Sequence, residues 1–308
     1  MHFTKLRSFI YNAEMRSKNI LGVRVDFGMT MDDVIDRIEQ AILDGNIRGL
    51  ICTTNPEFII EAQKDQEFKR LVNTSVISVP DGIGVLAAEY YLEEAEKVED
   101  GFLRIFKLLY LGMKTGFKTI KGDFKSKRIT GVALSERMFK LSADKNYSIF
   151  LLGGWPKTIL GKNMKLDGDF ANKTAEAMRK KYPSVNIVGA TSKYNRKKEH
   201  DEITLEHIRN RMKEVNIDTI DIMLVAYTQN TQEKWIDRNS SKVPVKISMG
   251  VGGTFDYLIG YYKKVPDIFT NMGLDWVFRL FTQPFRFRRI INAFPIFPIK
   301  IFLESIKK

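Results

Sequence analysis

Short runs of β-branched and apolar residues alternate with helical patterns along this chain, and this alternation limits its fold more than any other feature. Helix starts are marked as well, since Thr30 is placed to cap the helix that runs to Gly45, and Pro56 opens the next one. Strands are predicted at residues 22–27, 49–55, 75–82, 147–154, 184–190, 219–226 and 243–250. The pattern predicts an α/β fold, in which a largely parallel sheet is sandwiched by helices.

Polar or glycine-rich residues follow four of these strands, and ligands of open α/β sheets bind outside the carboxyl ends of the strands. Asp81 and a glycine directly follow their strand. This Asp-Gly pair forms either an ordinary turn or a turn that holds the Asp81 carboxylate rigidly at a pocket, as a general base requires. The segment Gly250 to Asp256 forms either a tight strand–helix junction or a backbone cradle for a phosphate. The other two segments that follow strands are Thr53 to Asn55 and Gln229 to Glu233. The residues from Gln229 to Glu233 either contact a sugar or base or cap the next helix.

The net charge of +12 is concentrated in two segments. Residues 102–128 hold eight Lys or Arg against one acid, and residues 277–308 hold seven against one. In residues 101–124 the apolar side chains fall on one side of a helical wheel and the lysines on another. Two interpretations remain open: the apolar side packs on the core of the protein, or the helix lies on anionic lipid.

Three arginines near the C-terminus, Arg279, Arg286 and Arg289, share one polar helical face that Pro284 is expected to interrupt. They either lie on a solvated face or hold phosphate, which the planar guanidinium can bind through two oxygens at once. The neighbouring aromatic residues show no recognition motif for nucleic acid.

The composition excludes several other kinds of site. Cys52 is the only cysteine, so no intrachain disulfide can form, which fits a reducing compartment. A zinc site is not expected, because the only histidines are His2, His200 and His207. No apolar run approaches the roughly 18–20 residues needed to span a bilayer, and residues 1–19 lack the apolar stretch of a secretory signal.

Several blocks of sequence, in order, carry a family resemblance. From Gly250 to Arg289, "GVGGTFDYLIGYYKKVP" and "GLDWVFRLFTQPFRFRR" resemble the WecG/TagA/CpsF family of bacterial glycosyltransferases (glycosyltransferase family 26) almost position by position. The blocks "LGVRVDFGMTMDDVIDRI", "TTNPEFIIEAQKD", "SVPDGIGV", "RITG" and "IFLLGG" precede them in the expected order. The resemblance covers nearly the whole chain.

This resemblance implies an inverting, metal-independent transferase that needs no cofactor. The donor would be a UDP-sugar carrying N-acetylmannosamine or its uronic acid, and the acceptor a polyprenyl-diphosphate-linked GlcNAc used in cell-surface polysaccharide or teichoic-acid-type synthesis. Asp81 would be the general base, with Thr53 and Asn55 beside it in the catalytic centre. The implied substrate-binding residues are Arg128, Gln232, Gly250, Gly252, Gly253, Asp256, Arg279, Arg286 and Arg289.

The resemblance also implies a division of the chain and a location. Residues 1–255 would form the α/β catalytic domain, with a basic amphipathic insertion at about 93–127, and residues 256–308 a helical appendage that closes the site. The appendage would contact an anionic membrane surface, which places the enzyme on the cytoplasmic, inner face of the cell membrane. The insertion is longer than in the family pattern, and its basic charge predicts a second membrane contact. No nucleic-acid partner is expected, and the sequence is compatible with a homo-oligomer.

The chain departs from the family pattern mainly on the donor side. The block "TQNTQE" keeps Gln232 and Glu233 but lacks the usual glycine, proline and lysine, Ala133 replaces an acid, and "GATSKY" lacks a glycine-containing turn. These changes leave open another UDP-hexose donor such as glucose, or a catalytically inactive protein that binds lipid diphosphate or a partner. The D-x-D in "LDGDF" (166–170), a pattern of metal-dependent transferases, is interpreted as incidental.

Overall fold

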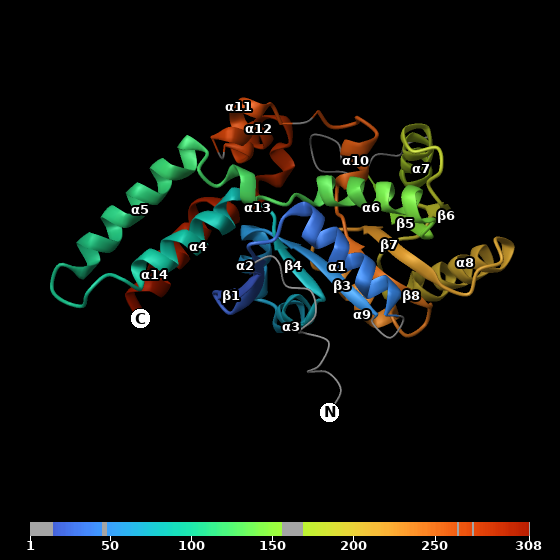
Figure 1. Ribbon diagram of the computed structural model, residues 1–308, viewed down its shortest axis with the longest axis horizontal. Helices are drawn as coiled ribbons and strands as arrows, with labels where there is room; N and C mark the ends of the chain where they lie inside the picture. Colours follow the sequence, from blue (N-terminus) through green and yellow to red (C-terminus); the bar gives the residue numbers. More distant parts are fainter. Residues whose placement is uncertain (1–14, 45–47, 156–168, 264, 273, 308) are drawn as a thin grey trace.

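A parallel six-stranded sheet forms the centre of the molecule in the computed structural model, which describes residues 15–44, 48–155, 169–263, 265–272 and 274–307 (Figure 1). The strand order is β4-β3-β8-β7-β5-β6, and every neighbouring pair is parallel. The predicted α/β fold is therefore confirmed. The strands are β3 Gly49–Thr54, β4 Ile77–Pro80, β5 Ile149–Gly153, β6 Ile187–Thr191, β7 Ile220–Ala226 and β8 Val245–Gly250.

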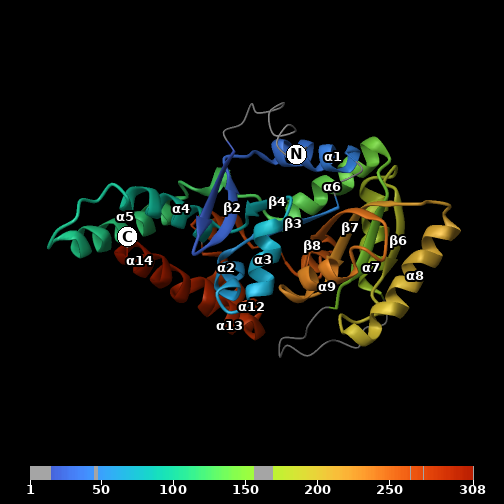
Figure 2. The ribbon, with the colours of Figure 1, turned by 90° about the horizontal axis from the view of Figure 1, so that it is seen from below.

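Helices cover both faces of this sheet because successive strand residues point to opposite sides (Figure 2). In β5, Ile149 and Leu151 join one core with helices α1, α6 and α7, whereas Phe150 and Leu152 join a second core with α8 and α9. The bounds of these helices are α1 Met31–Leu43, α6 Gly131–Lys145, α7 Phe170–Lys181, α8 Asp201–Glu214 and α9 Thr231–Asn239. A strand buried on both faces explains why its sequence is a nearly continuous apolar run.

The predicted helix starts are confirmed by their capping contacts. Thr30 and Asp33 form a reciprocal capping box at the start of α1, where the Asp33 amide donates to Thr30 Oγ1 at 3.2 Å and the Thr30 amide donates to Asp33 Oδ2 at 2.8 Å. Pro56 is the first residue of α2, Pro56–Ala62, and α3, Gln66–Thr74, follows it.

The predicted strand at residues 22–27 is present as β2, Val23–Phe27, but it does not belong to the parallel sheet. It pairs antiparallel with β1, Arg16–Ile20, in a separate two-stranded sheet. Sequence reasoning missed β1 because "RSKNI" is polar, and only its last residue is buried. Asp26 attaches this hairpin to β4, because its Oδ2 accepts a hydrogen bond from the Ser78 amide at 2.9 Å.

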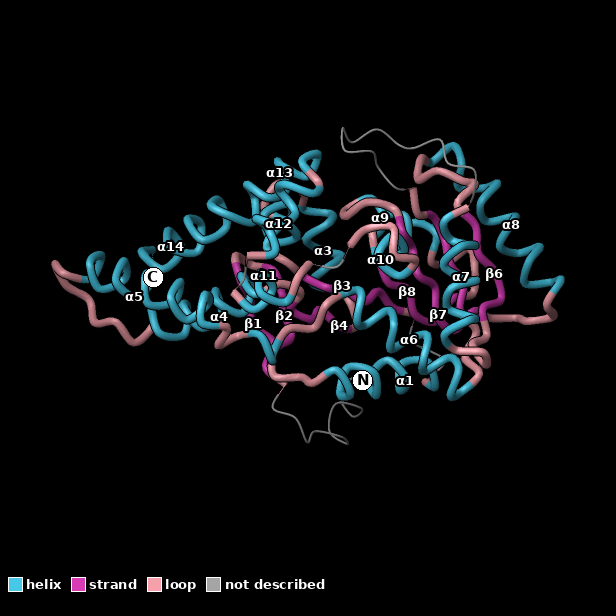
Figure 3. Tube along the Cα trace, turned by 90° about the horizontal axis from the view of Figure 1, so that it is seen from above, coloured by secondary structure: helices cyan, strands magenta, loops and turns pink. Residues whose placement is uncertain are grey.

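Three helices extend away from the sheet: α4 Ile83–Ala95, α5 Arg104–Lys121 and α14 Phe297–Lys307 (Figures 1 and 3). They share a third core to which Tyr91, Leu111 and Ile301 contribute. The predicted helix within 101–124 is therefore present, but the interpretation that its apolar side packs on the core is wrong. Of the eight residues on that side only Phe124 is buried, and the exposed ones are Phe102, Ile105, Phe106, Leu109, Met113, Phe117 and Ile120.

Short helices near the C-terminus cover the carboxyl edge of the sheet, and Pro284 ends the helix that carries Arg279, as predicted. The boundary predicted at residues 255/256 falls inside α10, which contacts α6 and α7. None of the described helices is long and apolar enough to cross a membrane. The elements are α10 Thr254–Leu258, α11 Asp267–Asn271, α12 Asp275–Thr282, a 3₁₀ turn Pro284–Arg286, α13 Phe287–Ile291 and a π turn Asn292–Ile296.

Candidate active site

A cavity of about 990 Å³ lies along the carboxyl edge of the sheet, between the strand ends and the C-terminal helices. Its position is the one in which open α/β sheets bind ligands. Its lining includes every residue that the sequence analysis assigned to catalysis or substrate binding: Thr53, Asn55, Asp81, Arg128, Gln232, Gly250, Gly252, Gly253, Asp256, Arg279, Arg286 and Arg289.

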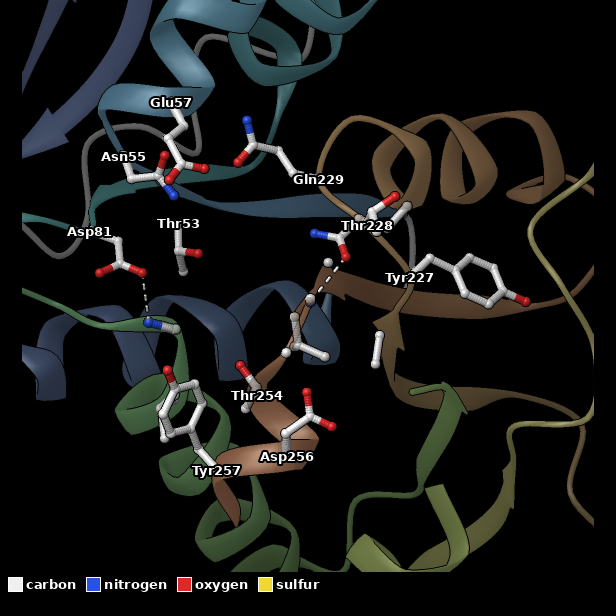
Figure 4. Close-up of a pocket in the computed structure, with 18 of the residues that line it drawn as sticks. Thr53, Asn55, Glu57, Asp81, Tyr227, Thr228, Gln229, Thr254, Asp256 and Tyr257 are labelled. Carbon is white, nitrogen blue, oxygen red and sulfur yellow. Dashed lines mark hydrogen bonds between the residues drawn. The ribbon is translucent and has the colours of Figure 1, made fainter. Parts of the chain in front are cut away.

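Asp81 directly follows β4, and hydrogen bonds to two other segments fix its position. Its amide donates to the Thr54 carbonyl at 2.8 Å, and its Oδ2 accepts from the Gly131 amide at 3.2 Å (Figure 4). Gly131 also packs closely on β3, since a Cβ there would lie 3.2 Å from Thr53 Oγ1. The carboxylate is thus held at the cavity wall while 22% of its side-chain surface stays exposed.

The environment of Asp81 favours proton uptake. Burial raises the pKa of Asp81 above its ordinary value, while the cations of Arg128 and Arg279 and the Gly131 hydrogen bond oppose this shift. Asp275, a further carboxylate nearby, raises the pKa as well. A carboxylate with a raised pKa that faces a cavity has the properties of a general base.

Thr53 and Asn55 stand beside Asp81 at the end of β3 (Figure 4). Asn55 caps α2, because its Oδ1 accepts a hydrogen bond from the Phe58 amide at 3.0 Å. The capping contact occupies the oxygen of the amide, so the Nδ2 hydrogens are the group that Asn55 can offer to a ligand in the cavity.

Arg128 connects this corner to the C-terminal helices. Its Nε lies 3.7 Å from Asp81 Oδ1, and its Nη1 lies 3.3 Å from Asp275 Oδ2. Thr270 Oγ1 donates to Asp275 Oδ1 at 3.3 Å. Sequence reasoning assigned no role to Thr270 or Asp275, although Asp275 begins the arginine-rich stretch.

The glycine segment after β8 is positioned by a buried amide–carboxylate pair. The Gly252 amide donates to Gln232 Oε1 at 3.0 Å, and Gln232 Nε2 donates to Glu233 Oε1 at 2.8 Å. Gln232 packs so closely on Gly250 that a Cβ there would lie 2.4 Å from Gln232 Nε2. Burial raises the pKa of Glu233 to about 7. Gln232 thus fixes the glycine segment, a role in addition to the predicted contact with substrate.

The three predicted arginines converge on the same cavity from α12, the 3₁₀ turn and α13. Arg286 covers Gly253, where a Cβ would lie 3.2 Å from its Nη2. Arg289 is hydrogen-bonded to Glu57 on α2 and, through Nη2 at 3.2 Å, to Gln229 Oε1. Burial lowers the pKa of Arg286 to about 10, and the cations of Arg289 and Arg279 add to this effect. Such a concentration of positive charge fits a polyanionic ligand.

Asp256 faces the arginines from α10. Burial raises its pKa to about 7, and the Arg286 cation only partly opposes this. Its Oδ1 is buried and has no hydrogen-bond partner in the part of the chain that the structure describes. Such an acceptor suits a ligand hydroxyl, because a buried polar atom is costly to leave unpaired.

The far end of the cavity contains residues that sequence reasoning missed. Trp155 after β5 stacks on Tyr227 after β7, with ring centroids 5.5 Å apart. Arg196 Nη1 donates to Thr228 Oγ1 at 2.7 Å, and Lys193 lines the same end. The only signal for these residues was that each follows a predicted strand.

The D-x-D at Asp167 and Asp169 does not take part in this cavity as far as the chain is described. Asp167 lies outside the described residues, and Asp169 caps α7 by accepting a hydrogen bond from the Asn172 amide at 3.1 Å. Within the described ranges, no group of three or more His, Cys, Asp or Glu side chains could hold a metal ion.

The fold is that of an α/β protein, and its candidate ligand site lies at the carboxyl edge of the sheet. The model of the glycosyl transferase WecG/TagA/CpsF family matches residues 18–100 and 111–308. The chain therefore belongs to the WecG/TagA/CpsF family and is a glycosyltransferase, as the sequence blocks predicted. The unmatched residues 101–110 contain the loop before α5 and its first turns.

Relatives with assigned names match over most of their length. A protein of Bacillus subtilis (strain 168) is 24% identical over 277 residues, which cover 89% of this chain and 87% of the relative. One of Staphylococcus aureus (strain MRSA252) is 24% identical over 284 residues, with 92% and 91% covered. Both carry the name N-acetylglucosaminyldiphosphoundecaprenol N-acetyl-beta-D-mannosaminyltransferase.

Proposed function

We propose that this protein transfers N-acetylmannosamine, or its uronic acid, from a UDP donor to a polyprenyl-diphosphate-linked GlcNAc, with inversion at the anomeric carbon. The names of its relatives support the sugar and the acceptor. The observation that carries the proposal is the position of Asp81, a carboxylate with a raised pKa in the same cavity as the glycine segment and three arginines. The product would serve cell-surface polysaccharide or teichoic-acid-type synthesis.

In the proposed step, the Asp81 carboxylate takes the proton of an acceptor hydroxyl while that oxygen attacks the anomeric carbon of the donor. The new carbon–oxygen bond forms as the bond from the anomeric carbon to the UDP diphosphate breaks, and the electron pair leaves with the diphosphate oxygen. Attack on the face opposite the leaving group inverts the configuration. Thr53 and Asn55 would orient the acceptor beside the base.

Both substrates carry a diphosphate, and the cavity offers positive charge to neutralise them. Arg279, Arg286 and Arg289, with the backbone amides of the glycine segment, would stabilise the charge that develops on the leaving diphosphate. Arg128 would hold an acceptor phosphate near Asp81 or keep the base ionised. In this proposal the arginines take the role of a metal ion, so transfer should persist when divalent cations are chelated.

The location follows from the acceptor, since a polyprenyl chain resides in a bilayer. We infer that the enzyme is peripheral on the inner face of the cell membrane and that its C-terminal helices cover the substrates there. The basic C-terminal segment supports this inference.

The test is the release of UDP from UDP-N-acetylmannosamine, with a short-chain lipid-diphosphate-GlcNAc as acceptor. Wild type should release UDP only when the acceptor is present. Asp81→Asn should lower kcat by about 10²- to 10⁴-fold, because the amide can accept the Gly131 hydrogen bond but cannot take a proton. Asp144→Asn, on the exposed surface of α6, is the matched control and should leave the rate unchanged.

The outcomes separate the parts of the proposal. Full activity of Asp81→Asn would refute the role of Asp81 as the base. Absence of release from wild type, with UDP still bound, would redirect the assay to UDP-glucose and other UDP-hexoses. If none of these donors supported transfer, the protein would be a binding protein for lipid diphosphate.

A further inference from the structure

Helix α5 presents its apolar side to solvent. Leu108, Leu111 and Thr115 are its buried residues, and they face α4 and α14. At about 100° per residue, the large apolar side chains fall on the opposite side of the helix. We call them the α5 stripe: Phe102 in the preceding turn, Ile105, Phe106, Leu109, Tyr110, Met113, Phe117 and Ile120, of which Phe102 is 93% and Met113 71% exposed.

The position of α5 makes this stripe accessible. The helix lies at one end of the molecule, beside α14 and away from the sheet (Figures 1 and 3). Its neighbour α14 also exposes apolar residues, Ile299 and Leu303. A monomeric soluble protein rarely leaves so many large apolar side chains together in water, so the surface is suited to a partner.

The stripe is partly an addition to the family pattern. Residues 101–110 are not matched by the family model, and five of the eight stripe residues lie within this segment. The helix nevertheless leads towards the active site, because the chain continues from Lys121 through a short 3₁₀ turn to Arg128 in the cavity wall. A partner bound along α5 would therefore lie on the part of the molecule that leads into the cavity wall.

The charges beside the stripe identify the partner. Lys107, Lys114, Lys118 and Lys121 lie along one flank of it, and the helix contains no acidic residue. The nearest acids in sequence are paired, Asp100 with Arg104 and Asp123 with Lys118. An apolar strip bordered by lysines fits a bilayer with anionic headgroups, where the apolar side chains enter the acyl boundary and the ammonium groups meet phosphates.

A second copy of the chain fits this surface less well. A symmetric contact through the stripe would bring the same lysine flanks together without an acid on α5 to neutralise them. We therefore propose that the α5 stripe inserts into the interfacial region of an anionic bilayer and holds the cavity next to its lipid-linked acceptor. Only the last clause rests on the proposed function.

The experiment is co-sedimentation of the full-length protein with vesicles of phosphatidylcholine, alone or mixed with phosphatidylglycerol. Wild type should bind the mixed vesicles more tightly, and salt should weaken this binding. Phe106→Ser/Met113→Ser/Phe117→Ser should weaken it by about tenfold or more, because three inserted side chains are lost. Lys107→Gln/Lys114→Gln/Lys121→Gln should reduce the salt dependence of this binding.

The matched control is Leu43→Ser/Ile203→Ser, two apolar residues on α1 and α8 that are 69% and 52% exposed. It should bind vesicles as wild type does, and all variants should keep the wild-type melting temperature, because exposed substitutions change stability little. Unchanged vesicle binding in the stripe variant would overturn the proposal. So would a wild-type dimer that forms without lipid and is lost in the stripe variant, because the occupant would then be a second copy.

Transfer to a water-soluble short-chain acceptor separates this inference from the proposed function. The stripe variant should keep wild-type activity in that assay, since none of its three substituted residues lines the cavity. Loss of vesicle binding with normal transfer supports the inference. Vesicle binding that depends on the stripe in a protein without transfer activity would contradict the proposed function alone.

Discussion

At the residue scale, the candidate base is controlled by neighbouring cations, of which Arg128 has the larger effect on its pKa. Arg128 lies between the carboxylates of Asp81 and Asp275 and lowers the pKa of Asp81, against the effect of burial. The base must be deprotonated to act, so kcat/KM should rise with pH through the pKa of Asp81. Removing the cation should therefore raise this pKa.

We predict that Arg128→Gln moves the acid limb of the pH profile of kcat/KM to higher pH, because the Asp81 carboxylate loses the charge that favours its ionised form. The measurement is the profile for both enzymes, with each rate normalised to its own maximum. Arg137→Gln is the control, since Arg137 pairs with Asp32 on the surface and is absent from the cavity wall. Normalised profiles that coincide for wild type and Arg128→Gln would contradict the prediction.

Individual site residues were predictable where their signal is local. Asp81 could be placed at a strand end because β-branched residues precede it and a glycine follows. Its partners Gly131 and Asp275 come from distant segments, and no local pattern indicates that they meet it. The role of Gln232 in fixing Gly252 was missed for the same reason.

At the element scale, α14 anchors the end of the chain to the helical extension. Phe297, Ile301 and Ser305 recur every fourth residue on its buried side, and Ser305 Oγ is hydrogen-bonded to Tyr91 Oη at 2.9 Å. The exposed side carries Ile299, so the same helix offers a buried and an exposed isoleucine for comparison.

Ile301→Ala should lower the free energy of unfolding by about 2–4 kcal/mol, because it removes buried methyl groups and leaves a cavity beneath α14. Ile299→Ala, at a position that is 53% exposed against 3% for Ile301, should change it by less than about 0.5 kcal/mol. Urea unfolding followed by circular dichroism provides both values. Equal losses in the two variants would show that α14 does not stay docked in solution.

The elements also show what periodicity can and cannot predict. The pattern of α5 predicted a helix with an apolar and a basic side, and both are present. It could not tell which side is covered, because that depends on how α4 and α14 pack against the helix, and α14 comes from the far end of the chain. The polar strand β1 likewise forms only because β2 provides a partner for it.

At the scale of the whole molecule, the cavity depends on the order of the strands. The strands β3 and β8 come from opposite ends of the chain but pair directly, with Gly49 opposite Ile247, so Asp81 and the glycine segment meet at one edge. Alternating elements predict a parallel sheet but not this order. The residues at the far end, Trp155 and Lys193, were missed because the positions of β5 and β6 in the strand order could not be predicted from the sequence.

At the scale of the whole molecule, two buried carboxyl groups should make a contribution to stability that falls as pH rises through the weakly acidic range. Glu233 and Asp256 have folded-state pKa values of about 7, above the ordinary values of 4.5 and 3.8. At pH values between the ordinary and the folded-state pKa values, these two groups bind more protons in the folded protein than in the unfolded chain. Their contribution to the free energy of unfolding therefore decreases with increasing pH. Above about pH 7 both groups are ionised in both states, and this contribution no longer changes.

Glu233→Gln should remove the contribution of Glu233 to the pH dependence of the free energy of unfolding, because an amide cannot ionise. The amide can still accept the Gln232 hydrogen bond. We expect the variant to be more stable than wild type at pH 8 by on the order of 1–3 kcal/mol, and nearly equal to it below about pH 4.5. Urea unfolding at a series of pH values measures the difference. Glu202→Gln, on the exposed face of α8, is the control and should follow wild type throughout. If the free energies of unfolding of Glu233→Gln and wild type differed by the same amount at every pH, the pKa of Glu233 would be the same in the folded and unfolded states, which would contradict the prediction.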